Sequence, residues 1–387
     1  MLLTNGWIHR VDAPDIPCGF VIFFQGKITA VGSMDDLPIG LSEERWDLKG
    51  AHVCPGFVDA HCHLGLFGSG LGFEADDINE ATDPVTPHLR ALDAVNPLDR
   101  YFSEARAAGV TTVLTVPGST NPVSGQGVIL KTAGRWVDEM ILSAPACMKF
   151  ALGENPKGAY SDRKEGPVTR MATAALTREI LSKTMEYRSK KLMSQADPEE
   201  EGPEYDAKLE ALLPLLGGEL SAHFHAHRAD DIATALRISR EFGLKPVIVH
   251  ATEGYLIAEL LERERVPVIT GPCLTDRSKP ELAGLTPENP ALLAKHTLVA
   301  ICTDHPETPI QYLPLCAAMA VRGGMSEEDA LAAITLNPAK ILGIDGRVGS
   351  ITPGKDADLV ISAAHPFDWK NGGPEQVYLN GEPMILR

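Results

Sequence analysis

The feature that most constrains the fold is an alternation, between about residues 51 and 346, of short apolar runs with longer helical stretches. Strands that alternate with helices predict parallel βαβ units. The continuous apolar run at 247–249 suits a strand buried on both faces, and residues 229–243 form a good helix candidate that ends at a glycine. The strand-like runs are PGFVDAHCHLG from 55, VTTVLTVPG from 110, ACMKFALG from 146, LSAHFHAH from 220, LKPVIVHATEG from 244, VPVITG from 266 and TLVAICTDHP from 297.

The two ends of the chain differ from this middle part. Strand-like stretches at 19–24 and 27–31 are separated by turn residues, and another strand is predicted at 357–361. We therefore expect residues 1–54 and 347–387 to form one small composite β domain, a β-sandwich, beside a domain of residues 55–346. Residues about 160–215 are charged and helical, and they predict either a solvated insertion or a lid over the site.

Composition excludes several classes of protein. Hydrophobic residues make up 44% and charged residues 22% of the 387 residues, which is typical of a globular protein. A net charge of −17 argues against binding to nucleic acid or to an anionic membrane. The N-terminal residues resemble no signal peptide, and the seven cysteines are scattered singly. We expect a cytoplasmic protein that acts on a small molecule and binds neither nucleic acid nor membrane.

The strongest chemical motif is the pair His61 and His63 at the end of an apolar strand. Successive strand side chains alternate between faces, so both imidazoles point to the same side while Cys62 points away. Two adjacent imidazoles predict a metal site.

Further candidate ligands close three later strands: His225, His250 and Asp304. His223 and His227 share the face of His225, and alternation alone does not decide which of the three reaches a metal. We favour His225, with His223 deeper and His227 beyond the strand end. Asp304 is placed to bind the metal weakly and to exchange a proton with its bound water.

Lys149 lies inside an apolar run, where a charged lysine is costly unless it is paired or modified. Reaction with CO2 would give a carbamate that bridges two metals. The alternatives are an ion-paired or unmodified lysine near the site, with Glu154 in the following turn as a rival carboxylate ligand.

These motifs, together with the segment from ITLNPAKILG to GKDADLVI, resemble the amidohydrolase superfamily, particularly its imidazolonepropionase and prolidase-like branches. The resemblance spans nearly the whole chain. It implies a TIM (β/α)8 barrel, a composite β domain, a site of one or two zinc-type ions at the C-terminal mouth, and a homo-oligomer. It matches His61, His63, His225, His250 and Asp304 to the ligands of strands one, five, six and eight, and Lys149 in position to a carboxylated lysine.

The predicted function is hydrolysis of a C–N bond in an amide, a cyclic amide or a dipeptide-like molecule by a metal-bound hydroxide. Asp304 would move the proton, and His250 would be either a metal ligand or a contact to the oxyanion. Arg170, Arg228 and His305 are candidate substrate contacts. The alternatives are a mononuclear deaminase on the same scaffold and a non-catalytic assembly protein.

Overall fold

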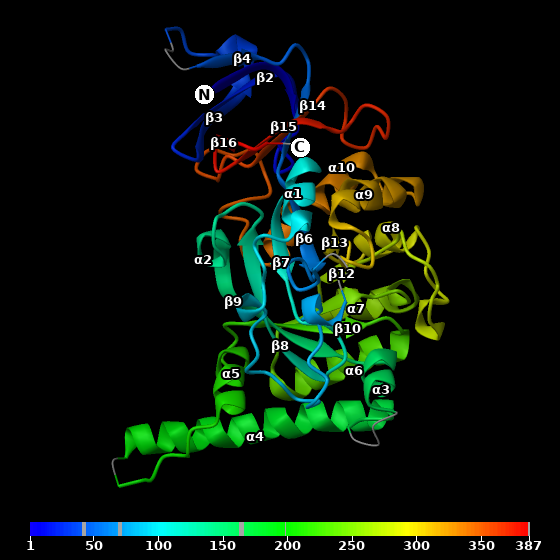
Figure 1. Cartoon of the computed structure of the whole chain (residues 1–387). Coiled ribbons are helices and arrows are strands. Elements are labelled where there is room, and N and C mark those ends of the chain that lie inside the picture. The colour runs from blue at the N-terminus through cyan, green and yellow to red at the C-terminus, as the bar shows by residue number, and fades with distance from the viewer. Residues whose placement is uncertain (41–43, 69–71, 162–165, 198, 386–387) are drawn as a thin grey trace.

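The computed structural model describes residues 1–40, 44–68, 72–161, 166–197 and 199–385. Residues 162–165 and 198 of the predicted insertion lie outside them. Figure 1 shows a sheet built from both chain ends at one end of the molecule, a barrel in the middle and one long helix at the opposite end.

The terminal segments form one hydrogen-bonded sheet in the order β16-β15-β14-β5-β1-β2-β3, with β4 paired to β1. The antiparallel pairing of β5 with β14 joins the N-terminal and C-terminal parts of the chain. The strand β1 pairs with β4 along its first half and with β5 along its second half. The strands of this sheet are β1 (Leu2–Ile8), β2 (Ile16–Phe24), β3 (Lys27–Ser33), β4 (Arg45–Asp47), β5 (His52–Pro55), β14 (Leu359–Ser362), β15 (Pro374–Leu379) and β16 (Glu382–Pro383).

The second sheet curls into a nearly closed eight-stranded barrel, and this confirms the predicted α/β barrel class. Its order is β13-β12-β11-β10-β9-β8-β7-β6. The two edge strands meet near the mouth, where Asp304 N donates to His61 O (3.1 Å) and His63 N donates to His305 O (2.8 Å). The barrel strands are β6 (Phe57–Cys62), β7 (Val110–Thr115), β8 (Val123–Lys131), β9 (Ile141–Ala151), β10 (Ser221–Ala226), β11 (Pro246–His250), β12 (Val268–Thr270) and β13 (Val299–Ile301).

One barrel strand departs from the expected parallel pattern. The sequence motifs gave seven of the eight strands and missed β8, which pairs antiparallel with both β7 and β9. Only residues 116–122 connect β7 to β8. This connection is too short for a parallel crossover, which needs a dozen or more residues, so the chain must turn back on itself.

Helices surround the barrel, and their packing decides which strand residues face inward. Phe224 and Phe150 stack with ring centroids 4.8 Å apart, in a cluster that includes the inner face of α6. Because side chains alternate along a strand, His223 and His225, on either side of Phe224 in β10, face the barrel interior. The helices are α1 (Arg100–Ala107), α2 (Val137–Met140), α3 (Glu154–Ser161), α4 (Arg170–Ala196), α5 (Ala207–Leu216), α6 (Ala229–Phe242), α7 (Ala258–Glu264), α8 (Asn289–Ala294), α9 (Leu313–Arg322), α10 (Glu327–Ala332) and α11 (Leu336–Ile341).

The described residues of the charged insertion are largely helical. One face of α4 is buried through residues at three- or four-residue spacing, including Thr177, Leu181 and Thr184, and α4 packs against α3, α5 and α6. In the described part of the chain, none of the helices combines the length and apolar character needed to cross a bilayer.

Candidate metal centre

The two histidines of β6 meet the aspartate that follows β13. Asp304 Oδ1 lies 3.2 Å from His61 Nε2 and 3.4 Å from His63 Nε2. Cys62 faces the other way, where its Sγ lies 3.5 Å from Leu114 O. The structure therefore places both imidazoles on one side, as the strand alternation predicted.

A second group of imidazoles adjoins the first. His225, His227 and His250 can each offer one ligand atom within 4.8 Å of the others, and so can His61, His250 and Asp304. The His227 ring is stacked on His250, with centroids 4.6 Å apart. The two groups overlap at His250, so they could hold one ion or two neighbouring ions. His227 follows the end of β10, as expected, yet still reaches this group.

His250 reaches the site because the backbone departs from a regular strand. Alternation would place it on the same face as Ile248, which packs in the cluster under α6. Instead, His250 has a φ of 71° and Ala251 a φ of 46°, both in the left-handed region. The His250 ring consequently lies 4.5 Å from the His225 ring and 5.2 Å from the His61 ring. Strain of this kind persists only where the surrounding structure enforces it.

Backbone carbonyl groups orient two of the imidazoles. His63 Nδ1 donates to Val116 O and His250 Nδ1 donates to Gly271 O, each at 2.7 Å. These bonds leave the Nε2 lone pairs available, which is the usual arrangement for metal-binding histidines. His250 Nε2 and His225 Nε2 are buried without a hydrogen-bond partner among the described residues. Buried polar atoms are normally satisfied, so the donor set fits a divalent cation.

Burial also sets the charge states of the cluster. It lowers the pKa of His250 to about 4 and the pKa of His61, His225 and His227 well below the usual value. These imidazoles are neutral at pH 7, as a metal ligand must be. Burial alone would raise the pKa of Asp304, but the adjacent imidazoles of His250, His61 and His63 hold it well below the usual range.

Lys149 lies inside the barrel beside the cluster. Its side chain is completely buried, and Nζ is 3.3 Å from His61 Nε2. Burial lowers the pKa of Lys149 to about 8. His223 sits opposite Lys149 in the β9–β10 register, deeper than His225, and both of its ring nitrogens are among the buried atoms without a described partner.

Sequence reasoning missed several charged residues near the site, among them Glu281 and Lys279. Glu281 Oε1 lies 3.7 Å from His227 Nε2, 4.0 Å from His225 Nε2 and 2.9 Å from Lys279 Nζ. The backbone N–H of Glu154 donates to Glu281 Oε2 at 3.0 Å. Glu154 itself thus presents its amide, rather than its carboxylate, to this group. No strand-end motif marks residue 281, because it lies in the short 3₁₀ helix η5 (Pro280–Leu282), within the connection between β12 and α8.

A cavity of about 310 Å³ opens beside the cluster. Its size is at the lower end of ordinary small-molecule sites. Polar groups from several connecting segments line it, including Asn155 and Lys279, and Lys279 Nζ donates to Asn155 Oδ1 at 2.7 Å. The lining residues from the cluster itself are His63, His225, His227 and Asp304.

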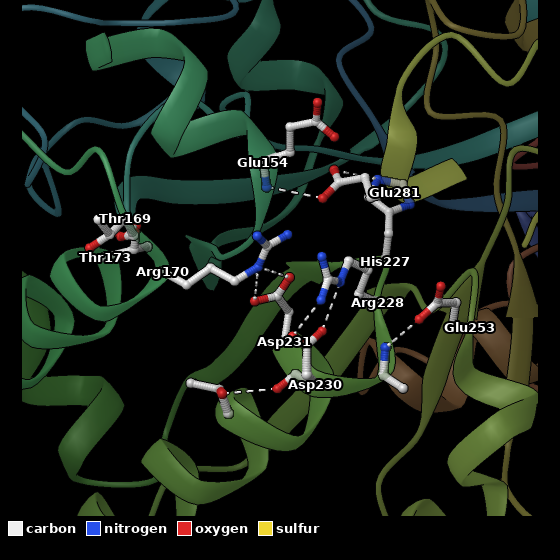
Figure 2. A network of polar contacts seen from close by, with 12 residues as sticks. Glu154, Thr169, Arg170, Thr173, His227, Arg228, Asp230, Asp231, Glu253 and Glu281 are labelled. Atoms are coloured by element: carbon white, nitrogen blue, oxygen red, sulfur yellow. Dashed lines mark hydrogen bonds and ion pairs between the residues drawn. The ribbon is translucent and has the colours of Figure 1, made fainter. Parts of the chain in front are cut away.

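The three predicted substrate contacts lie around this cavity rather than in its wall. Arg170 and Arg228 line a separate cavity of about 580 Å³, and Glu281 lies in its wall. Figure 2 shows the pairing there: Arg170 Nε donates to Asp231 (2.9 Å) and Arg228 to Asp230 (2.8 Å). His305 is buried with its ring 4.4 Å from Tyr101.

The fold and the cluster together define the class: a TIM-like barrel that carries histidine and carboxylate groups able to bind metal at the C-terminal ends of its strands. The chain belongs to the amidohydrolase family, whose model matches residues 52–384. Members of this family are metal-dependent hydrolases, as the sequence resemblance implied.

Known proteins support this assignment over the full length. The chain is 46% identical to an amidohydrolase from Thermotoga maritima of known structure, with a TM-score of 0.95 and complete coverage of both chains. It is 31% identical to the amidohydrolase tasK of Hapsidospora irregularis, over 98% of this chain but only 41% of that protein. It is 26% identical to an imidazolonepropionase of Porphyromonas gingivalis, over 92% of this chain and 85% of the relative.

Proposed function

We propose that this chain hydrolyses a C–N bond of a small amide, cyclic amide or dipeptide-like molecule with the help of one or two zinc ions. The observation that carries the proposal is the convergence of His225, His227 and His250 with His61 and Asp304 at the mouth of the barrel. Neutral imidazoles with one carboxylate are ligands that suit zinc. The imidazolonepropionase relatives support a cyclic amide as the first substrate class to test.

A divalent cation held by these residues would acidify a water molecule and polarise the scissile carbonyl. The chain's own contribution centres on Asp304, which stays ionised and lines the cavity. We propose that its carboxylate accepts the proton of the attacking water and later delivers it to the leaving nitrogen. General acid–base groups of this kind typically contribute about 10²–10⁴-fold to the rate. His61 and His63 orient Asp304 through Oδ1.

Lys149 and Glu281 are the residues that would decide whether one or two ions bind. A buried lysine with a lowered pKa carries more neutral amine, the form that reacts with CO2 to give a carbamate. We propose the carboxylated Lys149 as a ligand shared by two ions. Glu281 lies close enough to His225 and His227 for its carboxylate to become a ligand of the second ion after a small movement of the side chain.

Substrate orientation is assigned to the cations around the two cavities. Lys279 lines the cavity beside the cluster, and we propose that it binds an acceptor group of the substrate. We retain Arg228 and Arg170 as partners for a substrate carboxylate in the second cavity, whose wall includes Glu281. We retain His305 as a group that positions the substrate. Replacement of Arg228 by Gln should then raise KM for a substrate with a carboxylate more than it lowers kcat. If activity falls equally with charged and uncharged substrates, Arg228 does not bind the substrate carboxylate.

The testing experiment is metal content by elemental mass spectrometry, run in parallel on wild type, Lys149→Ala and the exposed control Lys49→Ala. About two equivalents of zinc that fall to one or none only in Lys149→Ala would support the shared carbamate. One equivalent in all three proteins would favour a mononuclear site, and release of ammonia from ring amidines would then identify the deaminase alternative. No bound metal in any of them would contradict the proposed function.

A further inference from the structure

The helix α4 has a second patterned face besides the buried one. This outward face is defined by eight residues that recur at seven-residue steps in two rows. One row holds the larger side chains, and the other holds only alanine and serine. The rows are Met171, Arg178, Met185 and Leu192, and Ala175, Ser182, Ser189 and Ala196.

Seven of the eight residues of the outward face are exposed, and Arg178 is half-buried. Met171 is 78% exposed, Met185 49% and Leu192 55%. All four small residues are exposed as well. Around the helix, with 100° per residue, this face is centred about 115° from the face that packs on the molecule. Figure 1 shows α4 running along the outer edge of the molecule, at the end opposite the terminal sheet. A chain alone in water gains nothing from three large apolar side chains on one exposed stripe.

The two rows are complementary to each other in an antiparallel arrangement. A two-fold axis that passes between residues 183 and 184 brings a larger side chain opposite a small one at every position along the face. The exchanged pairs are Met171 with Ala196, Ala175 with Leu192, Arg178 with Ser189, and Ser182 with Met185. Seven-residue spacing keeps such a seam continuous along two helices, and a two-fold axis requires this kind of self-complementary surface.

Charges on the flank of this face are compatible with the same arrangement. Glu179, Lys183, Glu186 and Lys190 alternate in sign along one side. Measured along the helix axis, the two-fold axis places Glu186 about 3 Å from the level of Lys183 of the second copy. It places Glu179 at the same offset from Lys190 of the second copy. Three of the remaining cations of α4 are paired within the chain, Arg170 with Asp231, Arg178 with Glu241 and Lys191 with Glu210, and Arg188 donates to Leu216 O. Self-association therefore brings together little unpaired positive charge from α4.

We propose that the outward face of α4 is a homodimer interface, in which α4 packs antiparallel against α4 of a second copy of this chain. The helix has 27 residues, so the seam is about 40 Å long. The small row allows the helix backbones to approach closely, and the large row fills the space beside it. The dimer leaves the mouth residues of each barrel in their own chain, so it is independent of the proposed function.

The first test is the mass in solution by multi-angle light scattering. The wild type should have twice the chain mass of 41.6 kDa. Met185→Glu places a charge beside the axis and should give a monomer. Leu98→Glu removes an equally exposed apolar side chain elsewhere, with Leu98 84% exposed, and should stay dimeric. A monomeric wild type, or a Met185→Glu protein that remains dimeric, would overturn the proposal.

The second test fixes the register. In a Cys18→Ser background, which removes the exposed native thiol, Ala175→Cys and Leu192→Cys chains are oxidised with oxidised glutathione, separately and after mixing. The proposed axis places position 175 opposite position 192, so only the mixture should give a disulfide-linked dimer. Equivalent positions of two identical chains lie 17 residues apart along the pair, about 26 Å, far beyond disulfide reach. Cross-linking of either variant alone, or none in the mixture, would refute the antiparallel register.

Discussion

A buried lysine links the barrel to the terminal sheet, and its replacement gives a sharp test of the energetics. Lys131 ends β8, and its Nζ lies 3.1 Å from Asp356 Oδ2 and in closer contact with Asp358 Oδ2. The side chains of all three residues are at most 5% exposed. Lys27 also pairs with Asp356, at 2.6 Å, but its side chain is 47% exposed. One carboxylate thus has a buried and an exposed lysine partner.

The expected loss in the free energy of unfolding of Lys131→Met follows from the partners that the two aspartates keep. At an effective dielectric constant of 20, an ion pair at 3.1 Å is worth about 5 kcal/mol before desolvation is subtracted. Asp356 keeps Lys27 and Arg347 as partners, whereas Asp358 keeps the backbone N–H of Asn380 at 2.8 Å. The substitution therefore leaves a buried carboxylate without a cation, which typically costs about 3–5 kcal/mol.

The assay is urea unfolding followed by tryptophan fluorescence and circular dichroism, with Lys27→Met as the matched control. The exposed pair should contribute less than about 1 kcal/mol, so Lys27→Met should lower the free energy of unfolding by no more than that. Lys131→Met should lower it by about 3–5 kcal/mol. Equal losses in the two variants would refute the argument that burial, rather than the number of ion pairs, determines the cost.

Three further predictions concern acid stability, packing and metal. Burial alone would raise the pKa of Asp356, but Lys131 and its other partners lower it, so the stability that Asp356 contributes is present above its usual pKa and is lost as pH falls through the lowered value. In Lys131→Met this loss should begin at a higher pH when Tm is measured between pH 6 and 3. Parallel curves of Tm against pH for the two proteins would contradict the prediction. Phe150→Ala should cost about 3–5 kcal/mol because Phe150 is fully buried, whereas Phe73→Ala, at a 95% exposed position, should change the free energy of unfolding by less than about 0.5 kcal/mol. Zinc added to chelator-treated protein should raise Tm, by an amount equivalent to about 2.7 kcal/mol at a hundredfold excess over Kd, and the rise should be much smaller in His225→Ala; an equal rise in both proteins would show that zinc binds elsewhere.

Local sequence rules predicted most of the strands and much of the candidate site. Alternation along β6 is a property of the backbone alone, so the spacing of His61 and His63 was enough to place both on one side. The ends of parallel strands meet at one edge of a barrel, so His225, His250 and Asp304 could be expected near them. The structure brings all five together, and their binding of metal stays a prediction.

Only the tertiary structure decided the remaining features. The direction of β8 follows from the short connection to β7, and the approach of Glu281 to His227 depends on the irregular connection between β12 and α8, which no periodic pattern describes. His250 turns toward His225 because its backbone adopts a left-handed conformation that alternation would not predict. The physical reason is the range of the forces involved: side-chain alternation is fixed within a few residues, whereas loop positions and strained dihedral angles are set by packing between segments far apart in the chain.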